Sequence, residues 1–231
     1  MLEELREQVL EANLELVRKG LVLYTFGNAS GISRAEGLVA IKPSGVPYEG
    51  MRPEDLVITD LGGRIVEGTL RPSSDLATHL VLYRAFAEIG GVVHTHSRYA
   101  TSWAQARRPI PCLGTTHADY FRGPVPVTRA MSPQEIEAAY EANTGEVIAR
   151  HFGGNNPMEV PAALVAGHGP FCWGPSAAEA AHNAVILEYV AEMAYYSVTL
   201  AEAPEELHPA HLDKHFLRKH GVSAYYGQKL D

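Results

Sequence analysis

Histidines provide the clearest chemical signal in this sequence. His94 and His96 are separated by one residue at the end of an apolar stretch, and His168 stands between two glycines. Residues two apart in a strand point to the same face, so the first two imidazoles can reach one ion. Together with the carboxylate of Asp75 they form a credible set of ligands for a catalytic zinc ion. Taken singly, each residue is equally compatible with a solvated strand, a turn or a helix cap.

Hydroxyl-bearing and glycine-containing turns provide a second group of candidates. Ser73 and Ser74 precede a predicted helix, Ser44 and Gly45 follow a predicted strand, and Asn28 lies in a small polar turn. Hydroxyls and backbone N–H groups at a helix N-terminus suit a phosphate group. The sequence has neither a P-loop nor a Rossmann fingerprint. We therefore predict a small phosphorylated ligand, with simple helix capping as the alternative for each serine pair.

Two further residues could carry protons. Asp119 lies among polar, apolar and aromatic neighbours, where a raised pKa would be useful, and Tyr226 lies near the C-terminus. An ion pair or N-cap for Asp119 and a docked aromatic ring for Tyr226 are the alternatives. Lys42 follows an apolar strand and is the one candidate for a Schiff-base mechanism, which would need a neutral amine.

Length and composition bound the function classes. The 231 residues carry 19 Lys+Arg against 27 Asp+Glu, and 46% of the residues are hydrophobic, which predicts one globular domain over 1–231. The acidic balance argues against nucleic acid as a partner. No apolar run approaches the roughly 20 residues of a membrane helix, and the charged first segment is unlike a signal peptide. We expect a cytoplasmic protein, without a membrane partner, whose two cysteines are free thiols.

Hydrophobic periodicity and capping signals predict the elements that must position these residues. Predicted helices cover 2–19, 75–89, 100–106, 132–150, 176–200 and 212–220, and predicted strands cover 21–25, 38–42, 56–59, 65–66, 92–96, 162–166 and 171–173. The segment 27–31 is predicted to be a loop. Strands that alternate with helices and hairpins favour a mixed sheet covered by helices.

Several motifs resemble the class II aldolase/epimerase family over nearly the whole chain. These motifs are TFGNAS, IKPSGVPY, PSSDLATH, VVHTHSRYATSWAQA, GTTHADYF, HGPFCWG and AYYGQ. The resemblance implies an α/β fold: a three-layer α/β/α sandwich with a central, mostly antiparallel sheet. It also implies a homotetramer with active sites at the subunit interfaces.

The resemblance assigns roles residue by residue. It implies one Zn²⁺ per subunit, with Mn²⁺ or Co²⁺ as possible substitutes, held by Asp75, His94, His96 and His168. It places a phosphate at Asn28, Ser44, Gly45, Ser73 and Ser74, with Lys42 close to the substrate. Asp119 and Tyr226 become a proton-transfer pair that reaches the site from the neighbouring subunit. Supporting residues are Thr115, Glu141, His215 and Arg218.

Within the family, the motifs are most similar to epimerases that interconvert L-ribulose 5-phosphate and D-xylulose 5-phosphate. Such enzymes break C3–C4, rotate glycolaldehyde phosphate and rejoin the bond, with the cation as a Lewis acid. Related fuculose-phosphate aldolases place a glutamate near the position of Asp75, so the aspartate favours an epimerase. A fuculose-phosphate type of aldolase, an epimerase of ascorbate catabolism directed to L-xylulose phosphate, and a sugar-phosphate-binding protein without turnover are the alternatives.

Overall fold

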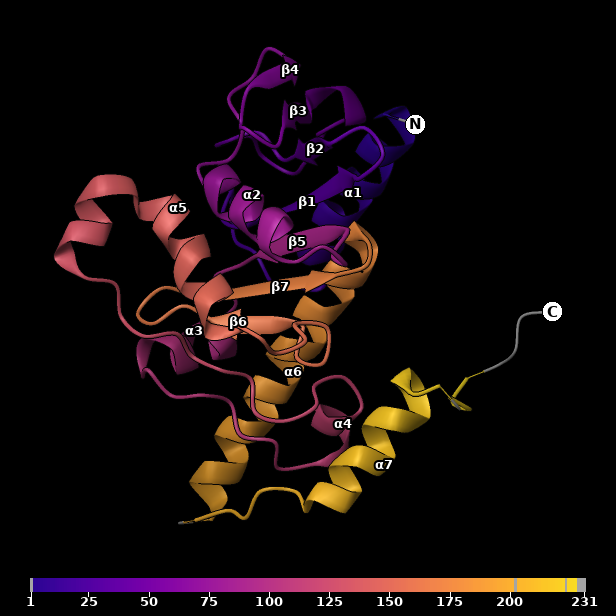
Figure 1. Ribbon diagram of the computed structural model, residues 1–231, viewed down its shortest axis with the longest axis vertical. Coiled ribbons are helices and arrows are strands. Elements are labelled where there is room, and N and C mark those ends of the chain that lie inside the picture. The colour runs from indigo at the N-terminus through magenta and orange to yellow at the C-terminus, as the bar shows by residue number, and fades with distance from the viewer. Residues whose placement is uncertain (1, 202, 223, 228–231) are drawn as a thin grey trace.

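One sheet organises the protein. The computed structural model describes residues 2–201, 203–222 and 224–227, and within them seven strands pair in the order β4-β3-β2-β1-β5-β7-β6 (Figure 1). All the pairings between these strands are antiparallel. The strands are β1 Asn28–Ser33, β2 Leu38–Ile41, β3 Val57–Asp60, β4 Ile65–Glu67, β5 Gly91–His94, β6 Ala162–Leu164 and β7 Pro170–Gly174.

Helices cover both faces of this sheet, which confirms the expected three-layer α/β/α sandwich (Figure 1). The helices α1, α3 and α6 lie on one face, and α2 and α5 pack against each other on the opposite face. The helical segments are α1 Leu2–Arg18, η1 Pro53–Asp55, α2 Leu76–Ala85, α3 Arg98–Gln105, α4 Thr115–Ala118, α5 Pro133–His151, α6 Ala177–Leu200 and α7 Pro209–His220.

The alternation of side chains along the strands creates one hydrophobic core on each side of the sheet. In β5, Val93 belongs to the core beneath α1 and α6, whereas its neighbour Val92 belongs to the core beneath α2 and α5. Both valines are buried. Full burial of such a side chain stabilises the fold by about 1.5–3 kcal/mol. The central strand is therefore apolar throughout and presents polar groups only where it ends, at His94.

The predicted strand at 21–25 is wrong, and so is the predicted loop at 27–31. Leu23 and Tyr24 are exposed, and β1 begins at Asn28 instead. The small residues of this strand let α1 approach closely, since a Cβ on Gly31 would lie 2.7 Å from Val9 Cγ2. The Asn13 side chain also pairs with the backbone of β1, so a run of small residues that resembles a loop is a strand packed under a helix.

The capping predictions for the two longest helices are confirmed. Ser132 accepts a hydrogen bond from the backbone N–H of Glu135 at the start of α5, and Ser176 does the same for Glu179 at the start of α6. In the described part of the chain, all the helices are too short or too polar to cross a bilayer.

Helices α4 and α7 lie apart from the sheet. They pack on each other at one end of the molecule, while α2 and the first four strands lie at the other end (Figure 1). Arg122 connects this end to the body through ion pairs with Glu159 and Asp213. The predicted metal ligands and phosphate-binding residues lie in the body of the protein around the sheet. Asp119, His215 and Arg218 lie at the end formed by α4 and α7.

Candidate metal centre and active site

Three imidazoles meet where β5 ends, beside the turn of the β6–β7 hairpin. One ring nitrogen from each of His94, His96 and His168 lies within 4.8 Å of the other two. Nε2 of His94 and Nε2 of His96 are 3.0 Å apart. His94 is the last residue of β5, so His96 lies beyond the strand that was predicted to hold both. The two rings nevertheless meet edge to face with centroids 4.8 Å apart, and the predicted convergence of these two residues with His168 is confirmed.

Backbone geometry explains why glycines flank His168. Gly167 has a φ of +76°, in the left-handed region that favours glycine. A Cβ on Gly169 would lie 2.8 Å from the Thr95 carbonyl oxygen, closer than side chains tolerate. The two glycines therefore let the turn between β6 and β7 press against the segment that carries the other two histidines.

Burial favours the neutral form of two of these imidazoles, His94 and His168. It lowers the pKa of His94 to about 3 and lowers the pKa of His168 below its ordinary value. Nδ1–H of His94 donates to the Pro170 carbonyl, so Nε2 presents a lone pair toward His96. Three ring nitrogens that converge in this way suit a divalent cation, and nitrogen donors suit zinc and its neighbours. The residues present therefore fit a divalent metal ion.

Asp75 and Asn28 lie beside the histidines. Nδ2 of Asn28 donates to Oδ2 of Asp75 at 2.7 Å. Burial raises the pKa of Asp75. The nearby His94 and His79 and the Asn28 amide lower that pKa by more than burial raises it, so the carboxylate is ionised at neutral pH. The mutually close ligand atoms are those of the three imidazoles, so the role of Asp75 as a fourth ligand stays a prediction.

The predicted phosphate residues line the same cavity as the histidines. This cavity has a volume of about 400 Å³, and Ser44, Gly45, Ser73 and Ser74 lie on its wall with Asp75. The two serine segments are joined by backbone hydrogen bonds, since Ser44 N–H donates to the Arg71 carbonyl and Ser73 N–H to the Lys42 carbonyl. The cavity therefore combines a metal-binding end with a hydroxyl-rich end at the start of α2.

Lys42 supports the hydroxyl-rich wall. Its Nζ donates to the Val46 carbonyl at 2.7 Å and to the Pro43 carbonyl at 3.3 Å, and it lies 4.6 Å from the centre of the Tyr48 ring. The side chain is 1% exposed, and burial lowers its pKa to about 8. The ammonium group thus fixes the loop that carries Ser44.

The predicted proton carriers lie elsewhere in the same chain. Asp119 accepts hydrogen bonds from Arg218 at 2.8 Å and from His215 at 3.0 Å. Burial raises the pKa of Asp119, but these two partners reverse that effect and hold it below its usual value. The guanidinium of Arg218 also lies 5.1 Å from the centre of the Tyr226 ring. We call these residues, with Thr115, whose carbonyl accepts from Asp119 N–H, the Asp119 cluster. The residues that line the 400 Å³ cavity include none of them.

Three further residues of the cavity region were not predicted. Tyr140 and Phe26 line the cavity, next to the predicted residues Glu141 and Asn28. Below it, His79 is fully buried with its Nδ1 2.7 Å from Ser30 Oγ, and burial lowers its pKa to about 4. Phe26 and His79 lie within the motifs TFGNAS and PSSDLATH, which could have indicated them, whereas Tyr140 had only its neighbour Glu141 as a signal.

Comparison with known proteins agrees with this arrangement. A solved L-fuculose 1-phosphate aldolase is similar, with a TM-score of 0.77 and 26% identity over 92% of this chain and 94% of that one. The L-fuculose-1-phosphate aldolase of Thermus thermophilus has a TM-score of 0.68 and 26% identity over 88% and 98% of the two chains.

A third similar structure is YgbL of Klebsiella pneumoniae, described as an aldolase, epimerase or decarboxylase, with a TM-score of 0.72. It is 24% identical over 93% of this chain and 98% of that chain. The family model of the class II aldolase and adducin N-terminal domain matches residues 7–195. This match spans the strands, the cavity and the histidine cluster, and the chain therefore belongs to the class II aldolase and adducin N-terminal domain family.

Proposed function

We propose that this protein is a zinc-dependent L-ribulose-5-phosphate 4-epimerase. The observation that carries the proposal is the gathering of Asp119 and Tyr226 at one arginine, Arg218. A stereochemical inversion needs two proton carriers, one for each face of the reacting carbon, and these are the two that the sequence singled out. The proposal includes one catalytic domain over 1–231 and a homotetramer in which neighbouring chains share each site.

The chemistry of C4 dictates the type of step. The C4 proton is not acidic, because C4 is not adjacent to the C2 carbonyl group. Breaking the C3–C4 bond avoids that difficulty: its electron pair moves toward the C2 carbonyl, and the C4 hydroxyl loses its proton to become the aldehyde of glycolaldehyde phosphate. When that aldehyde rotates before the bond re-forms, the configuration at C4 is inverted. A cation bound by the three imidazoles would supply Lewis-acid stabilisation of the developing negative charge.

The hydroxyl-rich wall would bind the phosphate group. Ser44, Ser73 and Ser74 offer hydroxyl groups, and Gly45 lies on the same wall of the cavity. Holding the phosphate keeps the rotating aldehyde within reach of its partner, which removes the entropic cost of a second encounter. Asn28 contributes a buried Oδ1 that lacks a protein partner among the described residues, and a substrate hydroxyl could donate to it.

Asp119 and Tyr226 would exchange the C4 hydroxyl proton. Because they do not line the cavity of their own chain, they would act on the cavity of a neighbouring subunit. Arg218 and His215 orient the Asp119 carboxylate and lie on α7, the helix that precedes Tyr226. Helix α7 would thus help to place both proton carriers at the neighbouring cavity, Asp119 through these two side chains and Tyr226 through the segment that follows the helix.

An aldolase that cleaves L-fuculose 1-phosphate is the second candidate. It is favoured by the similar aldolase structures at 26% identity. An epimerase directed to L-xylulose phosphate would use the same chemistry in another pathway. A sugar-phosphate-binding protein would use the cavity alone and would need neither proton carrier.

A single assay distinguishes an epimerase, an aldolase and a binding protein. The zinc-loaded protein is incubated with L-ribulose 5-phosphate and, separately, with L-fuculose 1-phosphate, and products are followed by NMR. We expect D-xylulose 5-phosphate from the first substrate and little cleavage of the second. Release of dihydroxyacetone phosphate from the second substrate without epimer formation would establish the aldolase instead. The absence of product from both substrates would favour a sugar-phosphate-binding protein without turnover.

Borohydride addresses the rival mechanism at Lys42. A Schiff base would be trapped as a covalent adduct when borohydride is added with substrate. We expect no adduct, because the ammonium group of Lys42 is engaged by two loop carbonyls. A trapped adduct at Lys42 would contradict the metal-dependent reaction.

A further inference from the structure

The three imidazoles of the metal centre are supported in different ways. His94 is anchored twice: its Nδ1–H donates to the Pro170 carbonyl at 2.9 Å, and its ring stacks on Phe171 at a centroid distance of 4.2 Å. Both partners are buried parts of β7. The orientation of this ligand is therefore built into the pairing of β5 with β7.

His168 has a different kind of support. It lies on the turn between β6 and β7, where its own N–H donates to the Val165 carbonyl and the Gly167 N–H donates to the Ala104 carbonyl. The Tyr140 hydroxyl lies 3.4 Å from Nδ1 of His168, and the two ring centroids are 6.0 Å apart. Histidines that bind metals usually donate the second ring N–H to an oxygen atom, which fixes the ring and its tautomer. Tyr140 offers that oxygen, as Pro170 does for His94.

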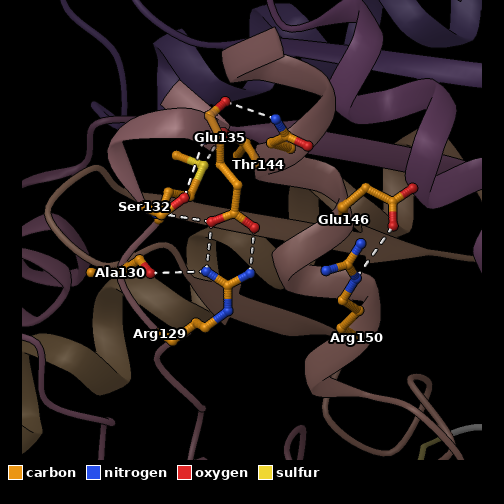
Figure 2. Close-up of polar contacts among 9 residues, drawn as sticks. Arg129, Ala130, Ser132, Glu135, Thr144, Glu146 and Arg150 are labelled. Atoms are coloured by element: carbon orange, nitrogen blue, oxygen red, sulfur yellow. Dashed lines mark hydrogen bonds and ion pairs between the residues drawn. The ribbon is translucent and has the colours of Figure 1, made fainter. Parts of the chain in front are cut away.

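The backbone around Tyr140 is shaped for this contact. Helix α5 is interrupted just before it, at Ala139, whose φ of −163° and ψ of 72° are not helical. The Asn143 side chain bonds the Glu135 carbonyl across the interruption, at 2.7 Å. At its start, α5 is anchored by the capping residue Ser132 and by the ion pair between Glu135 and Arg129 (Figure 2).

Helix α2 holds the other side of the same segment. The Thr78 hydroxyl donates to the Glu141 carbonyl at 2.6 Å. Gly145 lets α5 lie close to α2, since a Cβ there would be 2.6 Å from Val81 Cβ. The segment that carries Tyr140 is therefore fixed to the helix that begins after Asp75, and both Tyr140 and Asp75 line the cavity.

We propose that Tyr140 is a positioning residue that holds Nδ1 of His168 and thereby sets the affinity of the three-histidine centre for its divalent cation. This inference depends on metal binding by the centre and not on the reaction that the enzyme catalyses. It extends the metal site to α5, an element that supplies no ligand of its own. Removing the hydroxyl should leave the His168 ring free to turn away from the other two.

The test compares Tyr140→Phe with a control, Tyr189→Phe, which removes the hydroxyl of an exposed tyrosine on α6. Metal-free proteins are titrated with Zn²⁺ against a chromophoric chelator and, separately, with Co²⁺, whose visible absorption reports its ligands. For Tyr140→Phe we expect a metal dissociation constant about 10- to 100-fold higher and an altered Co²⁺ spectrum. Tyr189→Phe should match the wild type in both measurements.

The urea midpoint of each metal-free protein is measured alongside. We expect the midpoint of Tyr140→Phe to equal that of the wild type, because the lost contact orients a ligand and does not fill the core. A Zn²⁺ affinity within about threefold of the wild type, together with an unchanged Co²⁺ spectrum, would overturn the proposal. So would an equal loss of affinity in Tyr189→Phe. Since no substrate is present, neither result depends on the epimerase assignment.

Discussion

The cavity that contains the three histidines and the Asp119 cluster differ in how their surroundings change the charge of the titratable side chains. In the cavity, burial lowers the pKa values of His94 and His168, so the imidazoles are neutral and ready for a cation. In the Asp119 cluster, the hydrogen bonds from Arg218 and His215 keep the carboxylate charged despite its burial. The histidines can therefore accept a cation, whereas the negative charge of Asp119 is already compensated by Arg218. Under the proposed function each region lacks what the other supplies, and the two would have to meet between subunits.

Removal of the Asp119 carboxylate gives the largest expected effect. Asp119→Asn should lower kcat about 10²- to 10⁴-fold, the usual contribution of a positioned acid or base. Bound zinc, measured by elemental analysis, should be unchanged because the cluster is separate from the histidines. Asp213→Asn, which removes one partner of Arg122, is the matched control and should retain most activity. Loss of zinc from Asp119→Asn would assign Asp119 to the metal centre instead.

Mixing two inactive variants tests whether the regions meet between chains. His96→Asn lacks a metal ligand and Asp119→Asn lacks a proton carrier, so each homo-oligomer should be inactive. Random hybrid oligomers, formed by co-refolding or co-expression, should regain about a quarter of wild-type activity, since that share of sites combines two intact halves. If each site were formed within one chain, hybrids would stay as inactive as the parents.

Lys42 should produce a smaller, pH-dependent effect on substrate binding. Its pKa is lowered to about 8, so the ammonium group that holds the Ser44 loop is charged below that pH and neutral above it. We expect the KM for the sugar phosphate to rise as pH increases through about 8, with kcat less affected. Lys42→Met should raise KM at pH 7 and abolish this dependence. A KM profile with the same rise in Lys42→Met would assign it to another group.

His117 should give the smallest effect, on stability alone. It is buried beside Asp119, its Nε2–H donates to the Gly123 carbonyl, and burial lowers its pKa to about 4. Between about pH 6.5 and 4 the unfolded chain binds a proton that the folded protein does not, so stability falls as pH falls. The slope approaches about 1.4 kcal/mol per pH unit.

Urea unfolding of the wild type and His117→Gln at several pH values measures this contribution. The variant should be less stable near neutral pH and should lose less stability on acidification. Parallel curves for the two proteins would mean that His117 titrates normally in the folded state.

The sequence predicted those features that depend on local patterns. Capping of α5 by Ser132 and Glu135 could be inferred because the required residues lie three apart. The three histidines could be selected because an H-x-H pair at a strand end and a histidine between two glycines are uncommon patterns. The resemblance implied that these histidines share one metal ion, but the pairing of β5 with β7 that brings them together could not be predicted from periodicity.

Features that depend on packing partners could not be predicted. The strand β1 looked like a loop because its small residues make sense only beneath α1, where Gly31 meets Val9. Tyr140 reaches His168 because α5 departs from helical geometry at Ala139, and no capping or turn signal precedes that residue. The separation of Asp119 from the cavity is likewise a property of how α4 and α7 dock.

The register of β5 and β7 also matters for the stability of the protein. His94 lies directly opposite Phe171 in the pairing of β5 with β7, and His168 lies in the hairpin that leads into β7. A cation held by these imidazoles would therefore link β5 to the β6–β7 hairpin, although His94 and the first residue of β7, Pro170, are 76 residues apart along the chain. Because only the native pairing offers all three nitrogens, occupancy at 100 times the dissociation constant would add about 2.7 kcal/mol against unfolding. Thermal resistance should thus follow the supply of metal, even where no sugar is turned over.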